Sequence, residues 1–302
     1  MNLSQQKNRR GAALMLSLWA LFLLSATVIA WALEIDARMS LSGTASRVVE
    51  AEAMASSGAE VALDPAVDAG SSVLHGSLGR NQTYQAQITG EGGRLNLSWV
   101  VAGEDPQRLE ILRKYLENKG VDLNERDRMI DCLLDWIDPD DLVRLNGAEA
   151  SDSYKPANTF LSRMDDLKKV KGWEQFTTRP DWDADFTLYS TGPIDLVWAS
   201  RDVLLSLPGM SEGLVDRFLQ LRRGPDQIDG TADDLQFKSL DELRLALGFS
   251  LEQFKQLATL VGFNDQVLRV VSVGKSGEAT RVVQMIVRKT TGTPQMIRWK
   301  EL

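Results

Sequence analysis

A long uncharged stretch near the start of the chain constrains the fold more than any other feature. No charged side chain occurs between Gly11 and Leu33, and residues 1–10 carry three cations and no acid. About 20 consecutive apolar residues span a bilayer as a helix, and a basic flank stays on the cytoplasmic side. We therefore expect one membrane helix, a cytoplasmic N-terminus and export of the chain after Glu34.

Such a segment can be a secretory signal peptide, a plain membrane anchor, or a helix whose short basic leader is removed. Ala30-Trp31-Ala32 supplies the A-x-A site that a signal peptide needs. The helical pattern nevertheless continues to Pro65, because small apolar residues recur at spacings of three and four. These residues are Leu41, Ala45, Val48, Ala51, Ala55, Ala59 and Ala62. The pattern predicts a single helix over residues 12–63, apolar all round at first and amphipathic later.

The residues at the leader resemble those of type IV pilins and pseudopilins. The run Arg9-Arg10-Gly11-Ala12-Ala13-Leu14 is similar to the leader that prepilin peptidase removes. This resemblance implies cleavage between Gly11 and Ala12, and N-methylation of Ala12. Most pilins carry glutamate at the fifth mature position, which is Leu16 here. The absence of that glutamate is typical of pseudopilin K, the tip subunit of type II secretion systems, and residues 93–97 (GRLNL) also resemble a K-subunit stretch.

The family resemblance implies an α+β fold. A long helix would pack on an antiparallel sheet, and a large α-helical domain of two SAM-like or helix-hairpin-helix-like units would be inserted. The expected divisions are a leader (1–11), a membrane and filament-core helix (12–33), a half-helix with a first hairpin (34–104), an inserted α-domain (105–262, with units at about 105–190 and 191–262) and C-terminal strands (263–302).

Local patterns predict the individual elements. Alternating apolar residues over 84–88 and 95–101, with a glycine-rich turn between them, predict a hairpin. Helices are expected over 106–118, from a cap at Asn124, over 210–221 and over 240–247. Strands are expected over 267–273, 281–288 and 296–299. Residues 160–173 and 237–249 share a pattern of Phe, Ser, an acidic pair, Leu, Gly and an aromatic residue, which suggests related helical units.

An acidic segment offers the richest chemistry. Ten acids and three arginines lie between Asp122 and Asp152. Ca²⁺ takes six to eight hard oxygen ligands, although the spacing is not that of an EF-hand and a solvated loop remains an alternative. The resemblance of residues 135–154 to the calcium-binding segment of K subunits implies a structural Ca²⁺. The candidate ligands are Asp138, Asp140, Asp141 and Glu149 first, then Asp135 and Asp152.

A second acidic loop, residues 226–234, could also hold calcium, or its carboxylates could cap turns. The chain contains one histidine, His75, and one cysteine, Cys132. It therefore has too few of these residues for a metal cluster rich in histidine, and hardly any for a catalytic triad. The net charge is −8, which argues against nucleic-acid binding even though residues 207–210 resemble a helix-hairpin-helix turn. We expect no enzymatic activity.

Two functions remain open. In the first, the chain is a minor pseudopilin that caps the periplasmic pseudopilus and helps initiate its assembly for export of folded proteins across the outer membrane. Its implied partners are minor pseudopilins I and J, the inner-membrane assembly platform and prepilin peptidase. It would be single-pass in the inner membrane, mostly periplasmic, and at the pseudopilus tip after assembly. In the second, it is a membrane-anchored periplasmic calcium-stabilised binding module unrelated to a filament.

Overall fold

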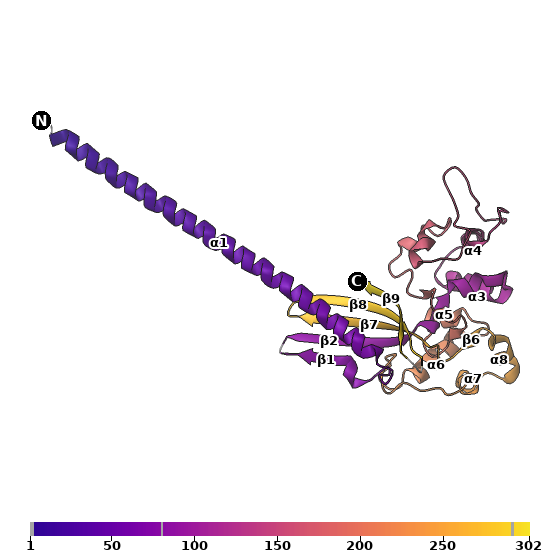
Figure 1. Cartoon of the computed structure of the whole chain (residues 1–302). Coiled ribbons are helices and arrows are strands. Elements are labelled where there is room, and N and C mark those ends of the chain that lie inside the picture. The colour runs from indigo at the N-terminus through magenta and orange to yellow at the C-terminus, as the bar shows by residue number, and fades with distance from the viewer. Residues whose placement is uncertain (1–2, 80, 291–292) are drawn as a thin grey trace.

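A single long helix dominates the N-terminal part of the molecule. The computed structural model describes residues 3–79, 81–290 and 293–302, so the first two residues of the expected leader lie outside it. Helix α1 (Leu3–Leu63) projects far beyond the rest of the chain, as Figure 1 shows. Its section from Ala12 onward is long and apolar enough to cross a membrane. It ends two residues before Pro65, which cannot continue a helix.

Only the second half of α1 packs against the rest of the chain. Ala51, Ala55, Ala59 and Ala62 are completely buried, whereas Leu41 is exposed. The apolar stripe that the sequence predicts is therefore covered from about residue 48 onward. Before that point the helix is exposed on all described sides, including its membrane-compatible section.

The buried half of α1 lies on a five-stranded antiparallel sheet with strand order β1-β2-β7-β8-β9. The strands are β1 (His75–Leu78), β2 (Gln82–Gly90), β7 (Val267–Ser276), β8 (Ala279–Arg288) and β9 (Gln295–Glu301). Helix α1 contacts β2, β7 and β8. The three expected C-terminal strands are present, each extended by one to three residues at one or both ends.

Glycines allow α1 to approach the sheet closely. A Cβ atom built on Gly274 of β7 would lie 2.0 Å from the carbonyl oxygen of Ala51. A Cβ atom on Gly58 of α1 would lie 2.4 Å from Oγ of Ser272. Neither distance is possible for a real side chain, so β7 meets the backbone of α1 at Gly274, and α1 meets the Ser272 side chain closely at Gly58.

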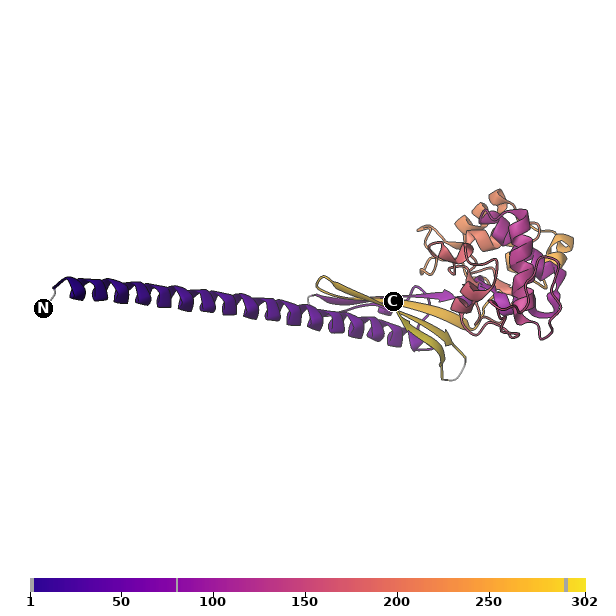
Figure 2. The same cartoon turned by 90° about the horizontal axis from the view of Figure 1, so that it is seen from above.

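A large α-domain is inserted between β2 and β7, which pair with each other from Gln82↔Ser276 to Gly90↔Leu268. Figure 2 shows this domain at the end of the sheet that is remote from the N-terminus of α1. Its helices are α2 (Leu97–Val101), α3 (Pro106–Asn118), α4 (Leu123–Ile137), α5 (Arg201–Leu205), α6 (Glu212–Arg222), α7 (Leu240–Leu247) and α8 (Leu251–Leu257). Its short strands β3 (Leu95–Asn96) and β5 (Ile194–Asp195) pair in parallel with β4 (Phe186–Thr187) and β6 (Val261–Gly262), respectively.

Short 3₁₀ helices complete the chain at Ser72–Leu74, Glu91–Gly93, Ala102–Glu104, Met164–Lys169 and Phe176–Thr178. The buried apolar side chains form two clusters. One runs from Leu95 to Val261 within the α-domain, and the other joins α1 to the sheet. The division of the α-domain into two units therefore stays a prediction, because one cluster includes side chains from both.

The expected hairpin between residues 84–88 and 95–101 is wrong. Residues 97–101 form helix α2, which Asn96 caps by accepting a hydrogen bond from the Trp99 N–H at 3.2 Å. Leu97, Val100 and Val101 are buried in the α-domain. An i, i+3, i+4 set overlaps with simple alternation in so short a segment, and β2 takes β7 as its partner instead.

Two expected helix starts are slightly displaced. Helix α4 begins at Leu123 after Asp122, rather than from a cap at Asn124. Helix α6 begins at Glu212 rather than at Met210, because Met210 and Ser211 still belong to the turn that follows Gly209. The expected helices over 106–118 and 240–247 match α3 and α7.

A buried ion pair joins the α-domain to the sheet. Glu91 is completely buried, and its two carboxylate oxygens accept hydrogen bonds from Nε and Nη2 of Arg269 on β7, each at 2.8 Å. Thr187 of β4 and Arg94 also donate to Glu91. Removing one partner of such a pair would leave an uncompensated buried charge, so the pair holds the two parts in one arrangement.

Candidate metal site

The acidic segment begins at the C-terminal end of α4. This helix buries Met129, Ile130, Leu133 and Trp136 in the α-domain core, which also draws Asp135 inside, where it is 0% exposed. Asp138 is the C-cap residue, and its N–H donates to the carbonyl of Leu134 at 3.0 Å. The C-terminal end of a helix carries partial negative charge. Two carboxylates at this position are therefore unfavourable unless a cation offsets them.

The following loop returns to the helix end and is fixed there. The N–H and Nδ2 of Asn146 both donate to Oδ2 of Asp131, at 3.1 and 3.0 Å. Gly147 then passes so close to Asp135 that a Cβ atom on it would lie 1.9 Å from Oδ2 of that carboxylate. Any side chain here would displace the buried Asp135 carboxylate, and this close approach brings Glu149 to the end of α4.

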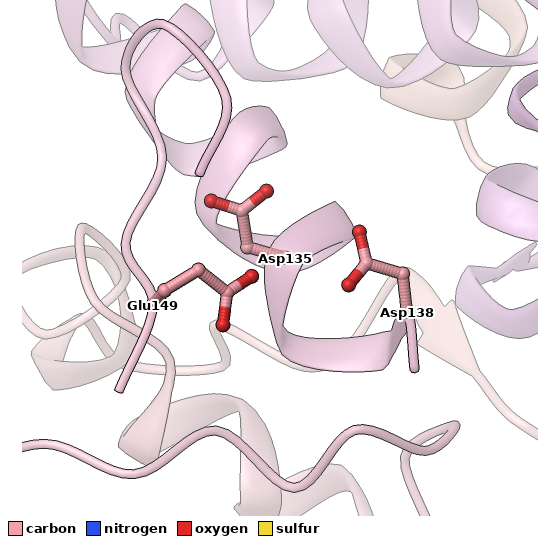
Figure 3. A group of neighbouring side chains, drawn as sticks. All are labelled: Asp135, Asp138 and Glu149. Atoms are coloured by element: carbon pink, nitrogen blue, oxygen red, sulfur yellow. The ribbon is translucent and has the colours of Figure 1, made fainter. Parts of the chain in front are cut away.

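Three carboxylates consequently meet. Oxygen atoms of Asp135, Asp138 and Glu149 lie within 4.8 Å of one another, and Figure 3 shows the first two on the end of α4 and the third on the neighbouring loop. Both Oε atoms of Glu149 and Oδ1 of Asp138 are buried without a hydrogen-bond partner among the described residues. Burial, followed by repulsion from Asp135 and Asp138, raises the pKa of Glu149.

One cation already contacts this group. Nη1 of Arg144 donates to Oδ1 of Asp135 at 2.5 Å and also to Oδ2 of Asp138, while Nη2 donates to Oε1 of Glu104 at 2.7 Å. Burial opposes the charge of this guanidinium, but its hydrogen bonds to Asp138, Asp135 and Glu104 outweigh that effect and raise the pKa of Arg144. Sequence reasoning assigned no role to Arg144, because it was one of three arginines among ten acids.

The remaining candidate ligands lie outside the three-residue group. Asp140 and Asp141 are exposed in the loop, where Oδ1 of Asp140 accepts a hydrogen bond from the Leu142 N–H at 2.8 Å. Both are still near enough to repel the Glu149 carboxylate. Asp152 is exposed and is not part of the group.

The donor set fits a hard cation. It offers carboxylate oxygens, and three of these oxygens are buried and lack partners among the described residues. Ca²⁺ prefers such ligands, whereas Zn²⁺ would favour nitrogen and sulfur. The calcium interpretation itself stays a prediction.

The second acidic loop has a different organisation. Asp229 accepts hydrogen bonds from the guanidinium groups of Arg222 and Arg223 at 2.7 to 3.2 Å. Oδ2 of Asp234 accepts from the Gly230 N–H at 2.6 Å, and Oδ1 of Asp226 accepts from the Ile228 N–H at 2.8 Å. These carboxylates cap turns and pair with arginines, as the second of the two interpretations expects.

The residues of the expected leader site lie on the free section of α1. The backbone of Gly11 is helical, and Ala12 and Leu16 are exposed. In the helix-hairpin-helix-like turn between α5 and α6, Gly209 has a φ of +77°. Arg222, at the end of α6, is almost fully buried against Asp229 and the carbonyl groups of Leu196 and Ala199.

Two comparisons with known proteins found similarity to components of the type II secretion system. Residues 93–179 match a family model described as "Type II secretion system (T2SS), protein K". One chain of the crystal structure of the GspK-GspI-GspJ complex from the enterotoxigenic Escherichia coli type 2 secretion system superposes with a TM-score of 0.59. The alignment covers 89% of this chain and 98% of that chain at 15% identity, so it shows a shared fold. No curated protein matches the sequence.

Both findings agree with the resemblance that the leader region and residues 93–97 indicated, and that resemblance is confirmed. The expected α+β fold, with a long N-terminal helix and an antiparallel sheet, is confirmed as well. The chain is therefore similar to protein K of the type II secretion system over residues 93–179, and it shares the fold of a chain in the GspK-GspI-GspJ complex.

Proposed function

We propose that this minor pseudopilin caps the tip of the periplasmic pseudopilus and helps initiate its assembly for the export of folded proteins across the outer membrane. The observation that carries this proposal is the placement of the α-domain at the opposite end of the molecule from the free apolar helix (Figure 1). The free section of α1 can pack with sister helices from below. The α-domain then covers the end of the sheet where a further subunit would stack.

Leu16 supports the same position in the filament. In most pilins the glutamate at this place pairs with the terminal amine of the subunit above, and an unpaired carboxylate in a membrane is costly. The exposed Leu16 side chain offers no such pairing. A subunit without this carboxylate cannot pair with the terminal amine of a subunit above it. The subunit at the tip has no neighbour above, so it does not need this pairing.

The partners follow from the same proposal. The solved complex to which the chain is similar joins GspK to GspI and GspJ, so minor pseudopilins I and J are the proposed neighbours. Prepilin peptidase would cut between Gly11 and Ala12, and the inner-membrane platform would assemble the mature subunit. The chain would have a short cytoplasmic N-terminus and a periplasmic bulk, because its basic residues precede the apolar section.

Two measurements test this function. The N-terminal peptide should begin at a methylated Ala12 in cells with prepilin peptidase and at Met1 in cells without it. A start at Met1 in both strains, or a cut after Ala32, would instead favour a plain anchor or a signal peptide. Leu16→Glu should move the subunit from the tip into the shaft and reduce secretion, while Leu16→Met should preserve both. Unchanged secretion and tip composition in the glutamate variant would contradict tip capping.

We also propose that Asp135, Asp138 and Glu149 hold a structural Ca²⁺. The buried oxygens of Glu149 that lack a partner among the described residues support this site. Asp140 and Asp141, in the same loop, are the candidates for completing it. Binding to the folded state alone must stabilise the protein, by about 3 kcal/mol when free calcium is 100 times the dissociation constant.

The calcium proposal is tested by thermal unfolding with calcium and with a chelator. The wild type should melt several degrees higher with calcium, and Glu149→Gln should lose most of that difference. Asp152→Asn removes the same charge at an exposed site outside the group and should keep the difference. Equal melting temperatures of the wild type in calcium and chelator, together with no calcium uptake in calorimetry, would show that the site binds no calcium.

A further inference from the structure

Arg144 occupies the approach to the proposed calcium ligands. Its side chain is 23% exposed, and it contacts Asp135 and Asp138, whose side chains are 0% and 16% exposed. The same guanidinium reaches Glu104 through its other terminal nitrogen. Glu149 is not among its hydrogen-bond or ion-pair partners in the described part of the chain. The arginine therefore pairs with the two carboxylates at the end of α4, offsets one of their two negative charges, and leaves Glu149 unpaired.

The guanidinium and a divalent cation cannot share this position. Nη1 uses Oδ1 of Asp135 and Oδ2 of Asp138, which belong to two of the three carboxylates that a metal would need. A dication and a guanidinium only a few ångström apart would also repel each other strongly in a partly buried site. Occupation by one cation consequently weakens occupation by the other.

We propose that Arg144 is a built-in competitor of the metal: its guanidinium pairs with Asp135 and Asp138 when no Ca²⁺ is bound and leaves them when Ca²⁺ binds. This inference rests on the calcium site proposed above. The calcium affinity of the site would then depend on how strongly Arg144 binds the same carboxylates.

The surrounding contacts allow the guanidinium to leave without disturbing the core. Glu104, at the rim, is 55% exposed and can keep its contact with the displaced side chain. The neighbouring Leu142, Val143 and Leu145 are all exposed, so no core packing depends on this segment. The loop backbone stays fixed by the hydrogen bonds from Asn146 to Asp131, which do not involve the three carboxylates.

Calorimetric titration of the detergent-solubilised full chain with CaCl₂ tests the inference. Arg144→Gln keeps a polar side chain but removes the charge, and it should bind calcium about ten-fold or more tightly than the wild type, since a charged hydrogen bond no longer competes. Its melting temperature in chelator should be lower than that of the wild type, and saturating calcium should close most of the gap. Arg281→Gln removes the same charge at an exposed position of β8 and should match the wild type in both measurements.

The outcomes separate the inference from the calcium site itself. If the wild type binds calcium and Arg144→Gln binds it equally or more weakly, Arg144 is no competitor although the site exists. If neither protein takes up calcium, the site proposal fails and the inference fails with it. Should Arg144→Gln not fold in chelator, Arg144→Lys decides the question. It keeps the charge but loses the fork that contacts several carboxylates together, and its affinity should exceed that of the wild type by a smaller factor.

Discussion

Burial of Asp195, in strand β5 of the α-domain, raises the pKa of its carboxyl group to about 6. The residue is 1% exposed, and its two oxygens accept hydrogen bonds from the N–H groups of Val197 and Asp265, at 2.9 and 3.0 Å. Repulsion from the Asp265 carboxylate adds to the effect. A native pKa above the unfolded value means that this group favours folding most when protonated. Its contribution is complete below the unfolded pKa and is lost as pH rises through about 6.

This sign gives a prediction for Asp195→Asn. Between pH 7 and pH 5 the wild type should gain about 1 kcal/mol of unfolding free energy relative to the variant, because only the wild type takes up the proton on folding. Denaturant unfolding of both proteins at the two pH values measures the difference. Asp152→Asn, at an exposed position, serves as the control. A parallel pH dependence in the wild type and Asp195→Asn would show that Asp195 does not titrate in this range.

The sequence predicted the part of the candidate site whose residues are close together in the chain. Asp135 and Asp138 lie one turn apart on a helix whose apolar face is plain in the sequence, so their proximity could be predicted. The ranking of the other candidates, with Asp140 and Asp141 before Asp135, was not recoverable from the sequence, since the path of the loop past the helix depends on the close passage of Gly147. The role of Arg144 depends on the same loop path, which no local pattern encodes.

Among the elements, those with their own start and stop signals were predicted well. Helix α3 follows a capping Asp105 with proline at its first position and ends before Gly120, whose φ is +75°. The segment after Gly93 was predicted wrongly, because its strand-like alternation carries no information about the partner of β2. That partner, β7, comes more than 170 residues later in the chain.

Two glycines on α1 allow the packing of this helix on the sheet to be tested, because one of them faces the sheet and the other does not. Gly58 faces the sheet, where a Cβ atom would lie 2.4 Å from Ser272 Oγ, while nothing lies within 4 Å of one built on Gly43. Gly58→Ala should therefore lower the unfolding free energy by about 1–3 kcal/mol through overpacking. Gly43→Ala should leave that free energy unchanged or raise it by up to about 1 kcal/mol, since alanine favours helix.

Thermal and denaturant unfolding of the two variants in detergent measure these changes. The substitution is chemically identical on the same helix, so the opposite signs isolate contact with the sheet from helix propensity. Equal destabilisation by both would mean that α1 does not pack on β7 along the Gly58 line. Equal stabilisation would lead to the same conclusion.

For the whole molecule, the α-domain is an insertion that the sheet does not need for its own core. The cluster that joins α1 to the sheet contains side chains from α1, residues 67–74 and the strands, and none from the α-domain. Gly90 and Leu268, at the two ends of the insertion, are paired neighbours in one antiparallel ladder. An antiparallel pair can be closed by a two-residue turn. Strands β2 and β7 are therefore paired up to the point where the α-domain is inserted, so a short turn could replace the domain.

This topology predicts that the two parts fold separately. Replacing residues 91–267 by Asn-Gly should join Gly90 to Leu268 through a two-residue turn, make β2 and β7 a hairpin, and leave a folded protein of α1 and the five-stranded sheet. Arg269 would lose Glu91, but with the domain gone it would face solvent, where an unpaired guanidinium costs little. Residues 91–266 alone should fold around their own apolar cluster.

Circular dichroism and thermal unfolding of both proteins check this prediction, and an unfolded hairpin protein would contradict it. If both fold, the Glu91 to Arg269 contact is one of the contacts that couple the parts, beside the hydrogen bond from Arg298 to Tyr189, and Arg269→Met in the full chain should lower the stability of the junction without unfolding either part.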